Sequence, residues 1–263
     1  MNRLLLTTMI CLALSLTGAE PGPLVIVGGG STPASVHRTL LEISGGKQAI
    51  IAVLPQASSR AERGQSSVEL FLKLGAKEAY IVRFDDSAKS KNLIDKATAV
   101  WFPGGSQAQL YEEISKAGLI DHLQARHKSG IPFGGTSAGA AIMSERMIPR
   151  APEERQLIIG NTPIQKGLGL VPELILDQHF IARARTSRLL SAVLDQPDLI
   201  GVGIGESTAI VVRDGQFRVI GTGSVVIIDA RKSTIHIGKP QMLQSGSNID
   251  LHILKSGQRF RYK

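Results

Sequence analysis

A single serine lies among small residues in the stretch Ile131–Met143, which reads IPFGGTSAGAAIM. Residues 135–139, Gly-Thr-Ser-Ala-Gly, match the pattern G-x-S-x-G. Where this pattern joins a strand to a helix, the turn strains the serine so that its hydroxyl projects from the sheet, and the next backbone N–H is placed to bind an oxyanion. An apolar run precedes Ser137 and an alanine run follows it. The spacing therefore predicts a nucleophile, and the alternative is a serine that only caps the helix.

A serine nucleophile needs a base, and His179 is the best placed of the six histidines. It follows the predicted strand LILD, and sites in parallel sheets gather at the carboxyl ends of the strands. The alternative is a hydrogen-bonded core histidine. The base in turn needs a carboxylate that fixes its tautomer and stabilises the imidazolium. Glu206, after the strand LIGVGIG, is the predicted partner; Asp177, two residues before His179 and on the same strand face, is the alternative.

The other histidines fit this role less well. His122 and His127 lie on a predicted polar helix and are expected to be solvated, and His37 lies on the first predicted helix. The order serine, acid, histidine of ordinary α/β-hydrolases would require His236 or His252, which lie in late predicted strands. The order serine, histidine, glutamate is favoured instead.

These residues need a sheet that brings strand ends together. Over residues 24–145, apolar runs alternate with helical patterns, which predicts right-handed crossovers and a parallel sheet. The strands are continuously apolar, as expected when both faces are covered. Predicted strands are 24–27, 49–55, 79–84, 99–105 and 131–135, and predicted helices are 33–43, 60–75, 107–129 and from Ser137 to about Glu145. Glycines close three of the strands, at 28–30, 104–105 and 134–135, and allow a ligand to approach the backbone closely.

The pattern changes after residue 150. A strand at 174–180 leads directly into a helix at 181–194, and further strands follow at 199–204 and from residue 208 onward. The last three, TAIVVRDG, QFRVIG and SVVIIDA, predict an antiparallel meander with Asp214–Gly215 as a hairpin turn. No linker interrupts the chain, so residues 20–263 are expected to form a single α/β domain with one mixed sheet.

Residues 1–19 have the features of an export signal. Arg3 supplies the positive start, residues 4–16 form an apolar run of 13 residues, and small residues end at Ala19. That run is short for a membrane span of about 20 residues. We therefore expect a cleaved signal peptide, a secreted or periplasmic protein and no membrane attachment after cleavage, with a retained anchor as the alternative. The only cysteine, Cys11, lies in this segment, which excludes a cysteine nucleophile from the mature chain.

The charge and the aromatic content of the chain limit the classes of molecule that it is expected to bind. The net charge is +8, with the basic residues dispersed rather than gathered in one run, which suits an acidic substrate and only weakly supports nucleic acid. Aromatic residues make up 4% of the chain, too few for a stacking surface for single-stranded nucleic acid. No histidine–carboxylate set has zinc-ligand spacing, so neither a metal nor another cofactor is expected.

Three blocks of sequence together carry a family resemblance: GGTSAGAAIMSERMI, GLGLVPELILDQHFIARARTSRLLSAV and IGVGIGESTAIVV. With VIVGGG and WFPGGSQAQL, they resemble the cyanophycinases, serine peptidases related to the aspartyl dipeptidases, over most of residues 24–230. The resemblance implies a three-layer flavodoxin-like fold, similar to class I glutamine amidotransferases, with a mostly parallel sheet and a C-terminal antiparallel extension. It also implies a homodimer that hydrolyses cyanophycin, a β-aspartyl-arginine polymer, to β-Asp-Arg dipeptides through an acyl-enzyme.

Residue roles follow from the resemblance. It implies Ser137 as nucleophile, His179 as general base and Glu206 as its orienting partner, with the N–H groups of Gly105 and Ala138 as oxyanion hole. The positions that match the family's substrate pocket are Gln107, Asp177, Gln178, Arg183, Arg185 and Arg188.

In such a pocket the arginines would bind substrate carboxylates, and Asp177 a substrate guanidinium. On a helix, Arg185 and Arg188 would share a face and Arg183 would turn away, so one or two of the three are expected to touch substrate; the alternative is a solvated helix face. Ser106 stands where the family often has Asp, and Ala184 and Ser187 where it favours glycine.

Three other functions stay open. The substrate could be another isoaspartyl or acidic peptide, because these departures lie near the predicted pocket. The chain could be a non-catalytic binding module of the same fold. VIVGGGSTP could bind a nucleotide, but Pro33 occupies the third glycine position of G-x-G-x-x-G.

Overall fold

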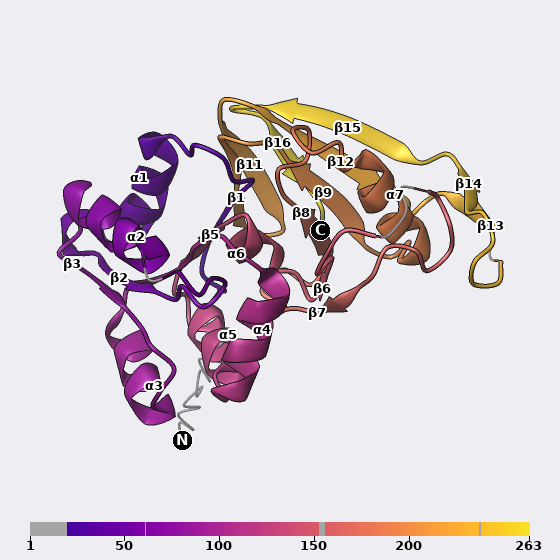
Figure 1. Ribbon diagram of the computed structural model, residues 1–263. Coiled ribbons are helices and arrows are strands. Elements are labelled where there is room, and N and C mark those ends of the chain that lie inside the picture. Colours follow the sequence, from indigo (N-terminus) through magenta and orange to yellow (C-terminus); the bar gives the residue numbers. More distant parts are fainter. Residues whose placement is uncertain (1–19, 61, 153–155, 237) are drawn as a thin grey trace, which may run out of the picture.

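The computed structural model describes residues 20–60, 62–152, 156–236 and 238–263 (Figure 1). Its main sheet contains eight strands in the order β16-β11-β10-β1-β5-β4-β2-β3. The five strands from β1 to β3 in that order are parallel, and β10, β11 and β16 extend the sheet in antiparallel fashion. The bounds are β1 Leu24–Val27, β2 Ile50–Val53, β3 Glu78–Ile81, β4 Ala99–Phe102, β5 Phe133–Thr136, β10 Thr208–Arg213, β11 Gln216–Gly221 and β16 Arg259–Arg261.

Helices cover both faces of this sheet because its strands are apolar on both sides. On one face, the helices α1 (Ala34–Ile43) and α2 (Glu62–Lys73) pack around Trp101. The other face carries α3 (Ser87–Lys96), α4 (Gln107–Lys116) and α5 (Ile120–Lys128), which pack against a core that contains Phe102 and Phe133. This arrangement confirms the predicted α/β class, with three layers, a mostly parallel sheet and an antiparallel extension.

A second sheet corrects the expectation of one mixed sheet. It has the order β15-β12-β9-β8, in which β8 (Leu174–Asp177) and β9 (Ile200–Ile204) are parallel, while β12 (Ser224–Asp229) and β15 (Asp250–Lys255) are antiparallel to their neighbours. The predicted Asp214–Gly215 hairpin is confirmed, since Arg213 pairs with Gln216 across it. The third strand of the predicted meander, however, is β12, and it lies in the other sheet.

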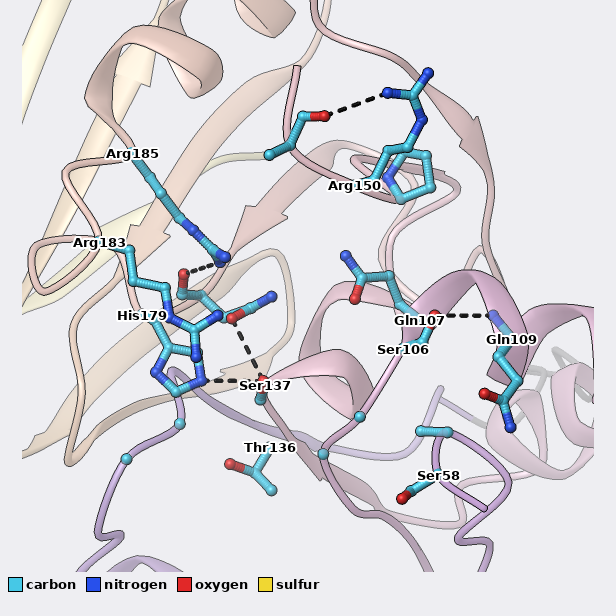
Figure 2. Close-up of a pocket in the computed structure, with 18 of the residues that line it drawn as sticks. Ser58, Ser106, Gln107, Gln109, Thr136, Ser137, Arg150, His179, Arg183 and Arg185 are labelled. Carbon is cyan, nitrogen blue, oxygen red and sulfur yellow. Dashed lines mark hydrogen bonds between the residues drawn. The ribbon is translucent and has the colours of Figure 1, made fainter. Parts of the chain in front are cut away.

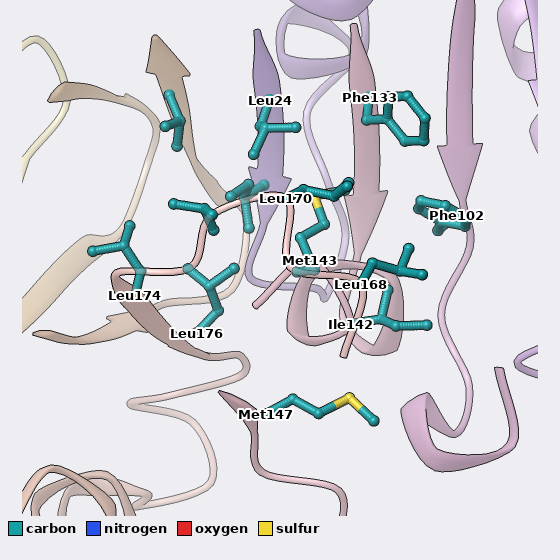
Figure 3. Close-up of a cluster of buried hydrophobic side chains, with 14 of the residues drawn as sticks. Leu24, Phe102, Phe133, Ile142, Met143, Met147, Leu168, Leu170, Leu174 and Leu176 are labelled. Carbon is teal, nitrogen blue, oxygen red and sulfur yellow. The ribbon is translucent and has the colours of Figure 1, made fainter. Parts of the chain in front are cut away.

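The two sheets share one hydrophobic core (Figure 3). Leu24 and Phe133 from the main sheet and Leu174 and Leu176 from β8 belong to the same buried cluster. This packing fixes the carboxyl end of β8 relative to that of β5. On the other face of the second sheet, α7 (Thr186–Asp195) packs against the inner strands.

Two predicted helices differ from the observed ones. The helix expected at 181–194 begins only at Thr186, because Ala184 adopts φ 49°, which an α-helix cannot accommodate. The helix after Ser137 is the single turn α6 (Ala138–Ala141) and ends well before Glu145. Arg183 and Arg185 therefore lie on a loop and not on a helix face.

His127 also differs from expectation. It is buried on α5, and its Nε2 lies 2.8 Å from the carbonyl oxygen of Gly22. Burial lowers its pKa from the ordinary value. The polar sequence of this helix does not show that the segment before β1, which contains Gly22, covers His127.

Four short strands complete the fold: β6 (Arg146–Met147) pairs with β7 (Gln165–Lys166), and β13 (Thr234–His236) with β14 (Ser245–Ser247). A 3-10 turn at Gly46–Gln48 follows α1. In the described ranges, every helix is too short or too polar to cross a membrane. The predicted signal segment, residues 1–19, lies outside the described residues.

Candidate active site

Ser137 lies at the sharp corner between β5 and α6. Its backbone has φ 54° and ψ −111°, a strained conformation for a non-glycine residue, and its N–H donates to the carbonyl of Val27 on the neighbouring strand. The hydroxyl makes no capping hydrogen bond to α6. The capping alternative therefore does not describe this serine, whose side chain is free to project from the end of the sheet.

His179 and Glu206 meet Ser137 at this corner (Figure 2). The Nε2 atom of His179 lies 3.1 Å from the Ser137 hydroxyl, and its Nδ1 lies 2.5 Å from Oε1 of Glu206. In the neutral ring Nδ1 is therefore the donor to the carboxylate, and Nε2 is left as an acceptor for the hydroxyl proton. One connected series of hydrogen bonds therefore joins three residues that follow three strands: Ser137 after β5, His179 after β8 and Glu206 after β9.

The imidazole is poised to act as a base. Burial lowers the pKa of His179 below its ordinary value, the hydrogen bond that its ring donates to Glu206 acts to raise it, and the nearby Arg183 guanidinium lowers it further. The net direction is downward. A neutral imidazole at physiological pH, next to a hydroxyl, is what proton abstraction requires.

Of the two predicted oxyanion donors, Ala138 follows Ser137 in the chain and Gly105 lines the same cavity as Ser137. Ala138 is the first residue of α6, and Gly105 follows β4 with φ 156°. A Cβ on Gly105 would lie 2.0 Å from the carbonyl oxygen of Ala57, so the chain passes too close there for any side chain. Neither N–H donates a hydrogen bond within the residues that the structure describes. Both remain available to a substrate oxyanion.

Asp177 was predicted to line the substrate pocket, but it is not among the residues that line the cavity. It is 1% exposed, and its carboxylate accepts hydrogen bonds from Nε and Nη2 of Arg188 and, at 3.4 Å, from Nη1 of Arg185. Arg185 also donates to the backbone carbonyl of Gln178. Because two guanidinium groups of the chain already occupy this carboxylate, it cannot bind a substrate guanidinium without breaking a buried ion pair.

The remaining predicted pocket residues divide into two kinds. Gln178 and Arg183 lie beside the nucleophile: Oε1 of Gln178 is 3.4 Å from the Ser137 hydroxyl, and Arg183 is close enough to lower the pKa of His179. Gln107 is buried, and its amide nitrogen donates to the carbonyl of Ile148 at 2.7 Å. Gln107 therefore fixes the chain near the cavity with its donor group.

The cavity in front of Ser137 measures about 790 Å³. Its lining includes residues that the sequence analysis did not select: Ser58, Ser59, Ser106, Gln109, Pro149 and Arg150. They come from the loop after β2, the start of α4 and the loop after β6. Ser106 and Gln109 belong to the segment WFPGGSQAQL quoted above, and the other four lie outside the quoted segments. Only Ser106 gave a local signal, as the N-cap that accepts from the N–H of Gln109. Within the described chain, no group of three His, Cys, Asp or Glu side chains is placed to hold a metal ion.

A hydroxyl, an imidazole and a carboxylate joined in series at the edge of a three-layer α/β fold define a serine-type hydrolase. Residues 24–220 match the model of peptidase family S51. The chain belongs to this family, and it is a serine-type peptidase similar to cyanophycinases.

Curated relatives agree with this assignment, and a solved structure agrees with the fold. The chain is 36% identical to a cyanophycinase of Geminocystis herdmanii over 84% of its length and 85% of that protein, and 35% identical to a Nostoc cyanophycinase over 86% and 79%. A peptidase E of Actinobacillus pleuropneumoniae is 23% identical over 67% and 76%. A crystal structure of a peptidase from an acI-B1 actinobacterium has a TM-score of 0.66 at 22% identity and covers 93% of this chain and 98% of its own. That structure supports the fold.

Proposed function

We propose that the chain hydrolyses cyanophycin to β-Asp-Arg dipeptides through an acyl-enzyme on Ser137. The observation that carries the proposal is the continuous series of hydrogen bonds from Ser137 through His179 to Glu206 beside an open cavity. The names of the curated relatives, at 32–36% identity over most of this chain, support the substrate.

The geometry suits two proton transfers by one imidazole. In the first half, Nε2 of His179 takes the hydroxyl proton while Oγ of Ser137 attacks the peptide carbonyl. The resulting oxyanion accepts hydrogen bonds from Gly105 and Ala138, and each such donor typically contributes about 3 kcal/mol. The imidazolium then gives its proton to the leaving amine, which breaks the C–N bond and leaves an ester on Ser137.

Water completes the cycle in the second half. His179 takes a proton from water, the hydroxide attacks the ester, and the second product leaves as a carboxylic acid while Oγ regains its proton. Glu206 accepts the hydrogen bond from Nδ1 and stabilises the imidazolium in both halves.

The charge of the cavity supports an anionic substrate. Four arginines line it, at positions 150, 183, 185 and 188, and no carboxylate does so among the described residues. A β-aspartyl-arginine polymer presents free α-carboxylates, to which guanidinium groups bind in bidentate fashion. The same charge also supports the alternative substrates, other isoaspartyl or acidic peptides.

Replacement of Ser137 by Ala tests the mechanism. S137A should abolish cleavage of cyanophycin and labelling by a serine-directed fluorophosphonate, while the melting temperature stays close to that of the wild type. Labelling of the wild type would separate an enzyme from a binding module of this fold. Mass spectrometry of the products from cyanophycin and from a set of β-aspartyl dipeptides would separate the substrates. Turnover by S137A would contradict the acyl-enzyme.

We further propose that residues 1–19 are removed on export to the periplasm or medium, and that residues 20–263 act as one domain in a homodimer. The support is the apolar run before Ala19 and the resemblance to the family. N-terminal sequencing of the secreted protein and light scattering of the purified chain test these two statements separately.

A further inference from the structure

Arg150 is a cation of the cavity that has no assigned role. It lies on the loop after β6 and lines the same cavity as Ser137 and Arg183 (Figure 2). Its one hydrogen bond to a described residue goes to the carbonyl of Ala151, is 3.5 Å long and is exposed. No described carboxylate forms an ion pair with it.

The loop that carries Arg150 is held in place by buried neighbours. Strand β6 pairs with β7; its residue Met147 is 0% exposed, and Ile148, the next residue, is 1% exposed. The carbonyl of Ile148 accepts the hydrogen bond from Gln107. Two residues further on, the chain reaches Arg150 at the cavity rim. Its side chain is exposed, and in Figure 2 the guanidinium points toward the carbonyl of Ala151 and away from Ser137. An anchored segment therefore holds Arg150 at the outer rim of the cavity.

The four cavity arginines are not equivalent. Arg185 and Arg188 both form ion pairs with Asp177, so each already has a carboxylate partner within the protein. Arg183 and Arg150 have no such partner among the described residues. They come from different walls: Arg183 stands beside His179, and Arg150 stands over the Gln107 side.

The scissile bond of a β-aspartyl-arginine polymer joins two repeating units, and each unit carries one free α-carboxylate. When that bond lies at Ser137, one carboxylate falls on each side of it. Two guanidinium groups on two walls, neither with an ion-pair partner among the described residues, match this pattern. We propose that Arg150 binds the α-carboxylate of the repeating unit across the scissile bond from the unit that Arg183 binds. This inference rests on the proposed function and adds a specificity residue to it.

The test compares two charge-removing variants with two substrates. Arg150→Gln is the test variant, and Arg146→Gln is the matched control, because Arg146 is exposed on β6 and does not line the cavity. The substrates are a synthetic (β-Asp-Arg)₃ oligomer with free α-carboxylates and the same oligomer with every α-carboxylate converted to a carboxamide. The assay measures kcat and KM for release of β-Asp-Arg units at low and high salt.

With the free oligomer, R150Q should lower kcat/KM about tenfold, mostly through KM, as expected for a lost charge-assisted hydrogen bond. R146Q should equal the wild type. With the carboxamide oligomer, wild type and R150Q should become equal, because the partner of Arg150 is gone. Arg150→Lys should recover part of the loss, and high salt should shrink the difference because the site is exposed.

Two failures are distinguishable. If the wild type cleaves the free oligomer but R150Q behaves as R146Q does, Arg150 has no role in binding and the inference is wrong. The inference is equally wrong if R150Q lowers activity by the same factor with both oligomers. If the wild type cleaves neither cyanophycin nor the oligomer, the proposed function fails, and this inference fails with it.

Discussion

Gly29 offers the sharpest test of the active-site geometry. It has φ 92°, and a Cβ placed there would lie 2.4 Å from Nε2 and 2.5 Å from Cε1 of His179. Ordinary contact begins at 3.4 Å, so in Gly29→Ala the imidazole must move by about 1 Å. A displacement of that size in a catalytic group typically lowers the rate about 100-fold. We therefore expect G29A to lose about two orders of magnitude in kcat/KM and in the rate of fluorophosphonate labelling.

A matched control separates this clash from backbone strain. Gly75 has φ 99°, and no atom lies within 4 Å of a Cβ placed there. Both G29A and G75A should lose about 1–2 kcal/mol of stability, because alanine disfavours the left-handed region. Only G29A should lose activity, which kinetics and thermal unfolding of the two variants would measure side by side. Activity of G29A within tenfold of G75A would refute the placement of His179 against this turn.

Two further predictions concern charge. Because burial lowers the pKa of His179, its neutral form persists to lower pH, and kcat/KM should reach half its maximum below pH 6.5. Glu206→Gln removes a negative charge that raises this pKa, so its pH–rate profile should shift to still lower pH while its kcat falls at least about 100-fold. An unchanged profile would contradict the assignment. Arg188→Met should lower the free energy of unfolding in urea by about 3 kcal/mol, because it leaves the buried Asp177 carboxylate short of a partner. Adding Asp177→Asn to this variant should restore part of the lost stability. If the single variant is as stable as the wild type, the Asp177–Arg188 ion pair is not needed for stability.

The sequence predicts the local features of the site well because each depends on neighbouring residues. An apolar run followed by Gly-Thr-Ser-Ala-Gly can form a buried strand and a sharp corner, and the structure has β5, Ser137 and α6 in that order. The rule that strand ends gather the site led to His179 and Glu206, and both are hydrogen-bonded there.

Sheet membership was not predictable because it depends on distant packing. A Cβ on Gly203 of β9 would lie 2.4 Å from the ring of Phe180, and one on Gly201 would lie 2.7 Å from Val193 of α7. The two glycines therefore leave room for Phe180 and α7 against β9. The sequence shows the glycines in IGVGI but not what fills the space above them, so the separate sheet of β8 and β9 was missed.

The role of Asp177 was missed for a related reason. Residue type alone shows a carboxylate near three arginines, and a substrate guanidinium is one possible partner. The sharp turn at Ala184 brings Arg185 back over the end of β8, where it and Arg188 reach the carboxylate first. A helix beginning at residue 181 would have placed these side chains differently.

The end of β1 explains why three distant corners converge. Three successive carbonyls there each accept one backbone hydrogen bond: Val27 from Ser137 at 3.0 Å, Gly28 from His179 at 2.6 Å, and Gly29 from Ser207 at 2.9 Å. The donors are two members of the hydrogen-bonded series and the neighbour of the third, and all three have φ between 49° and 57°.

Each residue with this positive φ destabilises the fold by about 1 kcal/mol, and the hydrogen bond that it donates to β1 stabilises the fold by about as much. The strain at each corner is therefore offset at the same residue. The relative positions of hydroxyl, imidazole and carboxylate are therefore set by β1 and not by the cavity rim. It follows that rim substitutions such as R150Q should change KM and substrate choice, whereas substitutions at the end of β1 such as G29A should change kcat and labelling. An R150Q variant that labels tenfold more slowly with a small fluorophosphonate would contradict this separation.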